Sequence, residues 1–127
     1  MKKILIVDDA IVARMILRKI LTQAGYEVVG EAGSGLEAIE KYKELKPDIV
    51  AMDIVMPGMD GIEATKEIVS IDPTANVIIT SAIHQKELSL KALDAGAASY
   101  IVKPFETDRL LRTFSRLFES KKGNDAD

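Results

Sequence analysis

Residues 4–24 read ILIVDDAIVARMILRKILTQA, and the hydrophobic spacing of this stretch changes partway along it. Ile4 to Val7 form a short apolar run rich in β-branched residues, which is typical of a buried strand. Ile11 to Ala24 instead carry apolar residues at the spacing of a helix, and Gly25 is a common residue just after a helix end. The apolar residues at this spacing are Val12, Met15, Ile16 and Ile20. The stretch therefore predicts one strand followed by one helix.

The same change of spacing recurs four more times along the chain. Further strands are predicted at Glu27 to Ala32, Ile49 to Met52, Val77 to Thr80 and Tyr100 to Val102. Further helices are predicted at Leu36 to Leu45, Gly61 to Ile71, Gln85 to Ala95 and Glu106 to Glu119. Continuous apolar strands that alternate with helices indicate a parallel sheet covered by helices on both faces. The predicted fold class is a doubly wound α/β domain, a (βα)5 three-layer sandwich.

Length and composition limit the choice of function. A chain of 127 residues suffices for one compact domain and is too short for two ordinary ones. It has 47% hydrophobic and 29% charged residues, no cysteine and a net charge of −3, which favours a soluble protein of the reducing cytoplasm. Scattered basic residues and the lack of a long apolar run argue against a nucleic-acid or membrane partner. We expect one domain over residues 1–120 and a polar, disordered tail over residues 121–127.

Charged and hydroxyl side chains follow four of the five predicted strands. They are Asp8-Asp9, Asp53, Thr80-Ser81 and Lys103. Because the carboxyl ends of parallel strands meet at one edge of a sheet, we expect these side chains to converge. Three converging carboxylates would repel one another by roughly 4 kcal/mol per pair, at about 4 Å and an effective dielectric constant of about 20. A Mg²⁺ ion bound by oxygen ligands, together with the Lys103 ammonium, would compensate this charge.

A carboxylate beside a cation and a lysine can act as a nucleophile toward phosphorus, because the charge on the transferred group is neutralised from several sides. Asp53 is the candidate for this role. The Ser81 hydroxyl could donate a hydrogen bond to a phosphoryl oxygen that the cation and the lysine leave uncovered. Asp8 and Asp9 taken alone could be a solvated cap of the helix that follows them. With Asp53 and Lys103 at the same edge, we favour the metal site.

Four motifs occur in an order and at a spacing that resemble a known family. They are IVDDA at residues 6–10, MDIVMPGMDG at 52–61, ITSA at 79–82 and YIVKPF at 100–105. Over essentially the whole chain, the sequence is similar to the receiver domains of response regulators in two-component systems. Among these it is most similar to stand-alone chemotaxis regulators. The resemblance implies a flavodoxin-like fold with parallel strands in the order 2-1-3-4-5.

The resemblance also implies a role for the matching residues at the strand ends. Asp53 would be the phosphoacceptor, and Lys103 would pair with the phosphoryl oxygens. The direct ligands of Mg²⁺ would be Asp9, Asp53 and the main-chain carbonyl of Val55. Asp8 would be an outer-shell ligand that reaches the ion through a water molecule. The bond between Lys103 and Pro104 resembles one that is cis in the family.

Two further residues match the switch of this family. Ser81, rather than Thr80, matches the switch hydroxyl because it directly precedes Ala82 and lies 28 positions after Asp53. A slip of one residue would point the side chain to the other face of the sheet. Tyr100 matches the aromatic residue that turns inward when the hydroxyl is drawn toward the phosphate.

Other positions depart from the family or have an ordinary structural reading. Val55 and Ile83 stand where fast-cycling chemotaxis regulators often carry polar side chains. Apolar groups there should hinder the hydrolytic water, so we predict a longer-lived phospho-Asp53. His84 is the only histidine and is expected to be an exposed loop residue, because it lacks partners for a transition-metal site. The glycines at positions 30, 33 and 35 lack dinucleotide-binding spacing and are expected to form a turn.

The implied function is a signalling switch rather than an enzyme. A sensor histidine kinase would donate the phosphoryl group, and the phosphorylated monomer would bind a motor switch or adaptor protein and a phosphatase. Control of chemotaxis through a flagellar or archaellar motor is the preferred output. The alternative is a single-domain phosphorelay intermediate. A flavodoxin-like redox protein or a phosphohydrolase is disfavoured, because acids after the first strand would repel a flavin phosphate and no G-x-x-x-x-G-K-[ST] loop occurs.

Family members signal through the surface of the fourth helix, fifth strand and fifth helix, and Leu90 is predicted to border that surface. The predicted sheet-facing residues of the fourth helix are Ser89, Ala92, Leu93 and Gly96. Leu88 and Leu90 are then expected to be partly exposed at its flanks.

Overall fold

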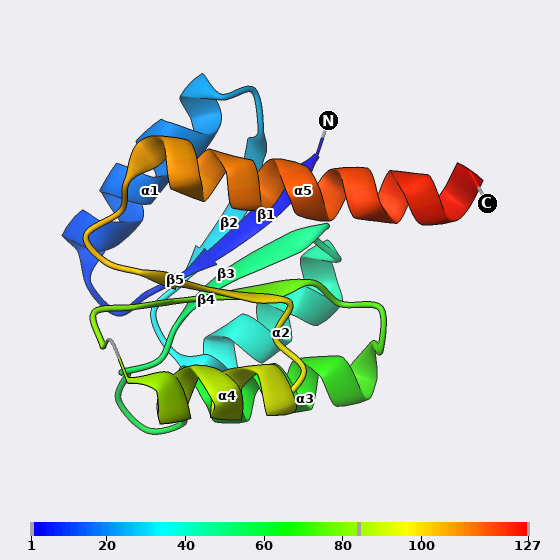
Figure 1. Ribbon diagram of the computed structural model, residues 1–127. Coiled ribbons are helices and arrows are strands. Elements are labelled where there is room, and N and C mark those ends of the chain that lie inside the picture. The colour runs from blue at the N-terminus through cyan, green and yellow to red at the C-terminus, as the bar shows by residue number, and fades with distance from the viewer. Residues whose placement is uncertain (1, 84, 127) are drawn as a thin grey trace.

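A computed structural model of the chain describes residues 2–83 and 85–126, with side chains described as far as Glu119. Within these residues, five strands alternate with five helices (Figure 1). The strands are β1 (Lys3–Val7), β2 (Glu27–Ala32), β3 (Ile49–Asp53), β4 (Val77–Ser81) and β5 (Ser99–Val102). The helices are α1 (Ile11–Gln23), α2 (Gly35–Leu45), α3 (Gly61–Ile71), α4 (Lys86–Asp94) and α5 (Thr107–Ala126). All neighbouring strands pair in parallel in the order β2-β1-β3-β4-β5, which confirms the predicted fold class.

The predicted bounds of most elements are close to the observed ones. The strand at Glu27–Ala32 and the helix at Gly61–Ile71 agree to the residue. The largest difference is at α5, which continues to Ala126, whereas the apolar pattern had placed the helix end at Glu119. Polar residues carry no periodic signal that could have predicted this extension. The division of the chain into a domain and a tail at residue 120 stays a prediction.

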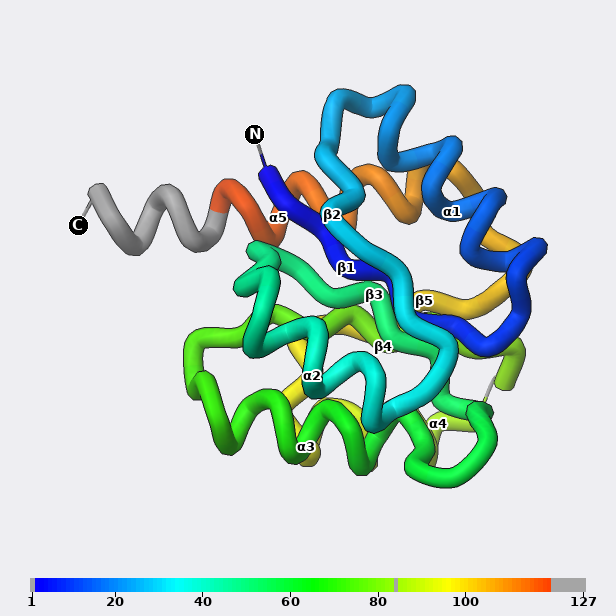
Figure 2. Tube along the Cα trace, turned by 180° about the vertical axis from the view of Figure 1, so that it is seen from behind, coloured from blue at the N-terminus to red at the C-terminus, as the bar shows by residue number. Residues whose placement is uncertain are grey.

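The sheet separates two hydrophobic cores. Leu5 and Val7 of β1 belong to the core under α2, α3 and α4, whereas Ile4 and Ile6 belong to the core under α1 and α5. Successive side chains of a strand point to opposite faces, so a strand covered on both faces must be apolar at every position. Figure 1 shows α1 and α5 on one face and the other three helices on the opposite face, and Figure 2 shows the same layers from behind.

Two helices place their apolar residues differently from the expected pattern. In α1 the buried residues are Leu17 and Leu21, and the more amino-terminal apolar residues are exposed. These exposed residues are Ile11, Val12, Met15 and Ile16. In α4 the prediction that Leu93 packs on the sheet was wrong, because 47% of its surface is exposed. Leu88 is partly exposed, as predicted, and its other side packs against the core. Leu90 is exposed, as predicted.

The strand order determines where the candidate functional residues lie. We call the edge of the sheet formed by the carboxyl ends of the strands the carboxyl rim, and the opposite edge the amino rim. The chain leaves β1 toward α1 on one face and leaves β3 toward α3 on the other, so the loops after these strands diverge at the carboxyl rim. Ligands of doubly wound sheets bind at such a switch point. No helix within the described residues is long and apolar enough to cross a membrane.

Candidate functional site

Three carboxylates converge at the carboxyl rim. Asp8 and Asp9 follow β1, and Asp53 is the last residue of β3. Each offers one oxygen atom, and these atoms all lie within 4.8 Å of one another. Asp8 and Asp53 are buried, whereas Asp9 is exposed. The convergence predicted from the strand ends is therefore present, with one carboxylate open to the solvent.

Asp8 is held on all sides. Its amide donates to the Ala32 carbonyl at 3.0 Å, which continues the pairing of β1 with β2. One carboxylate oxygen accepts from the Ala10 amide at 2.9 Å, and the other accepts from the Lys103 ammonium at 2.5 Å. These bonds lock the carboxylate in one orientation, because both of its oxygens have a fixed donor.

Lys103 brings a positive charge from the end of β5 to the same place. Its amide donates to the Ser81 carbonyl at 2.8 Å, which ties the β5 end to β4. Its ammonium lies 3.6 Å from an Asp53 carboxylate oxygen and forms the shorter contact with Asp8. The peptide bond from Lys103 to Pro104 is cis, as the resemblance implied. Lys103 therefore bridges the carboxylates that follow β1 and β3.

Lys103 compensates the negative charge of the three carboxylates only in part, as the pKa of Asp53 indicates. Burial raises the pKa of the Asp53 carboxyl, and the negative charges of Asp8 and Asp9 act in the same direction. Lys103 and the hydrogen bond from the Ile54 amide, at 2.9 Å, lower the pKa but do not cancel the rise. A further cation would relieve this repulsion, and carboxylate oxygens with a solvent-open side are the ligands that Mg²⁺ prefers. The residues present therefore fit the ion.

Gly61 is a site residue whose role the sequence did not reveal. Its amide donates to the Ile54 carbonyl at 2.9 Å, which brings the start of α3 against the end of β3. A Cβ atom at this position would overlap the main-chain carbonyl oxygen of Asp53. Asp60 caps the helix by accepting from the Glu63 amide at 2.9 Å. An Asp-Gly pair at a helix start was the available signal, but only coordinates show which backbone the glycine approaches.

The two predicted switch residues are joined through the backbone of Ile83. The Ile83 amide donates to the Ser81 hydroxyl oxygen at 3.1 Å, and the Ile83 carbonyl accepts from the Tyr100 hydroxyl at 2.8 Å. Tyr100 packs partly against the core under α2, α3 and α4. Among the described residues, no hydrogen bond joins Ser81 to Asp53. In the sheet register, Asp53 is paired with Thr80.

The remaining predicted positions lie at the mouth of the site or outside the described residues. Val55 is two residues beyond Asp53, and 63% of its surface is exposed. The assignment of its carbonyl as a metal ligand stays a prediction. Ile83 is half-buried beside Ser81. His84 lies outside the described residues.

The fold and the carboxylate–lysine site together define a class of protein. Residues 4–115 match the response regulator receiver domain family. The chain belongs to this family, as the four motifs indicated.

Its relatives include chemotaxis proteins. The chain is 55% identical over 116 residues to the chemotaxis protein CheY of Thermotoga maritima, an alignment that covers 91% of this chain and 97% of the relative. Its identity to CheY of Bacillus subtilis is 52% over 114 residues, with coverage of 90% and 95%. The fold matches a chain in the crystal structure of a CheX-CheY-BeF3-Mg²⁺ complex from Borrelia burgdorferi. That match has a TM-score of 0.89 and 37% identity and covers 92% and 89% of the two chains. The chain is thus a CheY-like response regulator, a signalling protein.

Proposed function

We propose that the protein is a phosphorylation switch in chemotaxis, which accepts a phosphoryl group on Asp53 from a sensor histidine kinase and then binds an output protein. The observation that carries this proposal is the meeting of Asp8, Asp9 and Asp53 with the Lys103 ammonium at the switch point of the sheet. Support also comes from the CheY relatives, which this chain matches over nearly their whole length.

The carboxylates of Asp9 and Asp53 and the Val55 carbonyl would hold Mg²⁺, with Asp8 acting through water. When bound, the ion would neutralise negative charge on the transferred phosphoryl group. The donor set and the raised pKa of Asp53 support this assignment. The crystal structure from Borrelia burgdorferi is of a complex with BeF3 and Mg²⁺, which supports the same chemistry in a relative.

In the transfer step, an Asp53 carboxylate oxygen forms a bond to phosphorus while the bond from phosphorus to the donor nitrogen breaks. The electron pair of that bond stays on the imidazole of the donor histidine. Lys103 is already within 3.6 Å of Asp53 and would move its hydrogen bond from Asp8 to a phosphoryl oxygen. Burial raises the pKa of the Asp53 carboxyl, and a more basic carboxylate oxygen is a stronger nucleophile when it is ionised.

The donor must cover the mouth of the site to bring its histidine to Asp53. Two exposed apolar side chains lie within two residues of the acidic residues in the sequence, Val55 after Asp53 and Ile11 after Asp9. Such side chains are typical of a surface that a second protein covers. They support a protein donor over a small free phosphate ester.

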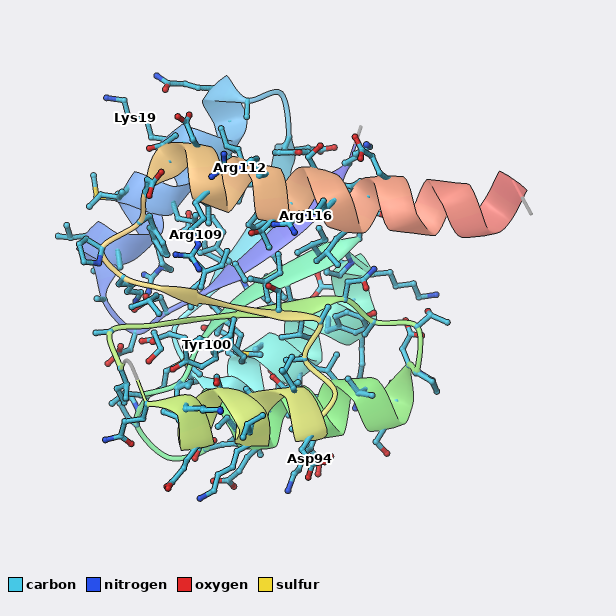
Figure 3. All side chains as sticks on the ribbon, viewed as in Figure 1. Lys19, Asp94, Tyr100, Arg109, Arg112 and Arg116 are labelled. Atoms are coloured by element: carbon cyan, nitrogen blue, oxygen red, sulfur yellow. The ribbon has the colours of Figure 1, made fainter. Side chains whose placement is uncertain are left out.

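The output would be read at the surface of α4, β5 and α5. A hydrogen bond from Ser81 to a phosphoryl oxygen would act on the Ile83 peptide, which also holds the Tyr100 hydroxyl. Figure 3 shows Tyr100 between α4 and α5, with Arg109, Arg112 and Arg116 along α5. The same surface contains a groove lined by residues of α4 and β5, including Leu93 and Tyr100. A motor switch protein, an adaptor or a phosphatase would bind here.

The proposal is tested by adding acetyl phosphate and Mg²⁺ to the purified protein and measuring its intact mass. The wild-type protein should gain one phosphoryl group, whereas Asp53→Asn should gain none. Asp60→Asn is the matched control, because Asp60 is a nearby acid that caps α3 and does not belong to the cluster. A phosphoryl group on Asp53→Asn, or none on the wild type with Mg²⁺, would reject the assignment.

The choice of Ser81 as the switch hydroxyl has its own test, because Thr80 is the residue paired with Asp53. We expect Ser81→Ala to slow phosphorylation by acetyl phosphate by about tenfold, the scale of one lost charge-assisted hydrogen bond. Thr80→Val should keep the wild-type rate. The reverse pattern would transfer the role to Thr80.

The phosphorelay alternative shares this chemistry and differs only in the fate of the phosphoryl group. The CheY relatives favour the chemotaxis output. Phosphorylated protein should therefore keep its phosphate when mixed with the histidine phosphotransfer proteins of the same organism. Rapid transfer to one of them would favour the relay.

A further inference from the structure

Arg14 makes a contact with the acidic site that the proposed function does not use. It lies in the first turn of α1, and its Nη1 atom donates a hydrogen bond to the main-chain carbonyl of Asp8. Its Nε atom donates to Glu31 of β2 at 2.9 Å. Arg18, one turn later, donates to the other Glu31 carboxylate oxygen at 2.7 Å. The Arg14 side chain is largely buried, with 18% of its surface exposed.

The contacted carbonyl belongs to the peptide bond between Asp8 and Asp9. The Asp8 amide and both Asp8 carboxylate oxygens are held by other groups, so Arg14 supplies the donor for the main-chain oxygen. Within the described part of the chain, the Asp9 carboxylate has no hydrogen bond or ion pair of its own. Its orientation therefore depends on the peptide plane that Arg14 holds. Mg²⁺ demands nearly ideal octahedral ligand placement, so a loose plane would weaken its binding.

We propose that Arg14 is a positioning residue for the metal site, which sets Mg²⁺ affinity by fixing the Asp8–Asp9 peptide while Glu31 fixes its guanidinium. This inference rests on the proposed Mg²⁺-dependent function. It concerns residues of α1 and β2 that touch neither the ion nor the phosphoryl group.

The sign of the effect separates positioning from simple electrostatics. A guanidinium near a cation site repels the cation, so removal of the Arg14 charge should tighten Mg²⁺ binding if charge alone mattered. Loss of a hydrogen bond that orients the ligands acts in the opposite direction and typically weakens metal affinity by about 10- to 100-fold. Glu31 already offsets much of the guanidinium charge. Burial alone would raise the pKa of Glu31, but hydrogen bonds from Arg18 and Arg14 lower it overall, so Glu31 stays ionised.

The experiment is a titration of the full chain with MgCl₂, in which two-dimensional amide NMR spectra are recorded at each step to obtain the dissociation constant. The wild type is compared with Arg14→Gln, which removes the charge and the donor geometry, and with Arg18→Gln as the matched control. Arg18 bonds the same Glu31 from the same helix but does not reach Asp8. We expect Arg14→Gln to raise the Mg²⁺ dissociation constant by about tenfold and Arg18→Gln to leave it close to that of the wild type.

Glu31→Gln provides a second variant that leaves both arginines in place. It should raise the dissociation constant by less than Arg14→Gln, because it loosens the guanidinium without removing its bond to Asp8. Melting temperatures without Mg²⁺ report the purely structural effect, and Arg14→Gln should lower them more than Arg18→Gln, because Arg14 is more buried and makes one more hydrogen bond.

Unchanged or tighter Mg²⁺ binding in a folded Arg14→Gln protein would overturn the inference. Equal weakening in Arg14→Gln and Arg18→Gln would also overturn it, because the Glu31 network as a whole would then be responsible. If Arg14→Gln does not fold, Arg14→Lys takes its place, because it keeps the positive charge and removes the fork of donors. Weakened Mg²⁺ binding by Arg14→Lys then supports the inference, and unchanged binding overturns it. Failure of the wild type to bind Mg²⁺ would instead reject the proposed function, so the two failures are distinct.

Discussion

The carboxylates at the two rims of the sheet have different surroundings. At the amino rim, Asp72 accepts a hydrogen bond from the Tyr42 hydroxyl at 2.7 Å. It also accepts from the amide and hydroxyl of Thr74, at 3.0 Å and 2.6 Å. Burial, and then the hydrogen bond to Asp72, raise the pKa of Tyr42, so the phenol keeps its proton and stays a donor. The donors of these three hydrogen bonds are neutral groups of the chain itself.

At the carboxyl rim, three carboxylates converge, and the Lys103 ammonium pairs with two of them, those of Asp8 and Asp53. The Asp53 pKa is raised by burial and by its acidic neighbours. Groups arranged in this way destabilise the folded state unless something else binds. Asp72 therefore has donors from the folded chain, whereas the carboxylates of the carboxyl rim are arranged for a ligand. Changes at the two rims should therefore differ in sign and in their response to Mg²⁺.

The largest effect on stability is expected from Gly61→Ala, because this substitution disturbs the backbone at Asp53. The new Cβ atom would overlap the Asp53 carbonyl oxygen, and neither main-chain segment can move away freely. We expect a loss of about 3 kcal/mol in the free energy of unfolding, the upper range for forced overpacking. Urea denaturation of the wild type and the variant measures this loss.

Gly58→Ala is the control for that substitution. Gly58 has a φ of +74° but open space around its Cβ position, so alanine there meets only the backbone penalty of about 1 kcal/mol. Equal losses at positions 58 and 61 would show that the close approach of α3 to β3 has no special weight.

The next effect is a gain of stability. Asp53→Asn removes one of three converging charges, so without Mg²⁺ at neutral pH it should raise the free energy of unfolding by on the order of 1 kcal/mol. Addition of Mg²⁺ should stabilise the wild type more than the variant, because the ion binds only the folded acidic cluster. Thermal melts of both proteins with and without MgCl₂ test this, and a destabilised variant without the ion would contradict it.

The difference in stability between Asp53→Asn and the wild type should depend on pH. A raised pKa means that folded Asp53 binds its proton more tightly than the unfolded chain does. Its contribution to stability is therefore present at low pH and is lost as pH rises through the folded pKa. The advantage of Asp53→Asn in the absence of Mg²⁺ should shrink as pH falls from about 7 toward about 4. An advantage independent of pH would mean that charge is not its cause.

Most of this architecture was predictable from the sequence, because apolar spacing reports burial directly. The apolar runs at β1, β3 and β5 predicted three of the strands, and the charged residues at the ends of these strands predicted that Asp8, Asp9, Asp53 and Lys103 form one cluster. Parallel strands leave no other place for these side chains. The strand order itself followed only from the resemblance.

The missed features depend on contacts between distant segments. Arg14 looks like any charged residue on a helix, and only the packing of α1 on β2 places it on the Asp8 carbonyl. Leu93 fits a helical stripe, yet the position of α4 over the sheet exposes it. Neither the closeness of Gly61 to Asp53 nor the pairing of Tyr42 with Asp72 has a local sequence signal.

At the amino rim, Tyr42→Phe should destabilise the protein by about 1 kcal/mol, since it removes one donor from Asp72 and keeps the packing of the ring. In contrast to Asp53→Asn, this loss should be the same with and without Mg²⁺. Urea denaturation in both conditions checks it. A Mg²⁺-dependent loss would show that the two rims are coupled.

The smallest effect on stability is expected at the mouth of the carboxyl rim. Val55→Asn changes an exposed side chain, so the free energy of unfolding should stay within about 0.5 kcal/mol of the wild type. The variant should nevertheless lose phosphate from Asp53 severalfold faster, because an amide can orient the water that a valine excludes. Decay of the phosphorylated mass after removal of acetyl phosphate measures this rate. Leu36→Asn, an equally exposed apolar residue on α2 outside the site, should leave the rate unchanged. An unchanged rate for Val55→Asn would mean that the apolar mouth serves partner contact and not phosphate lifetime.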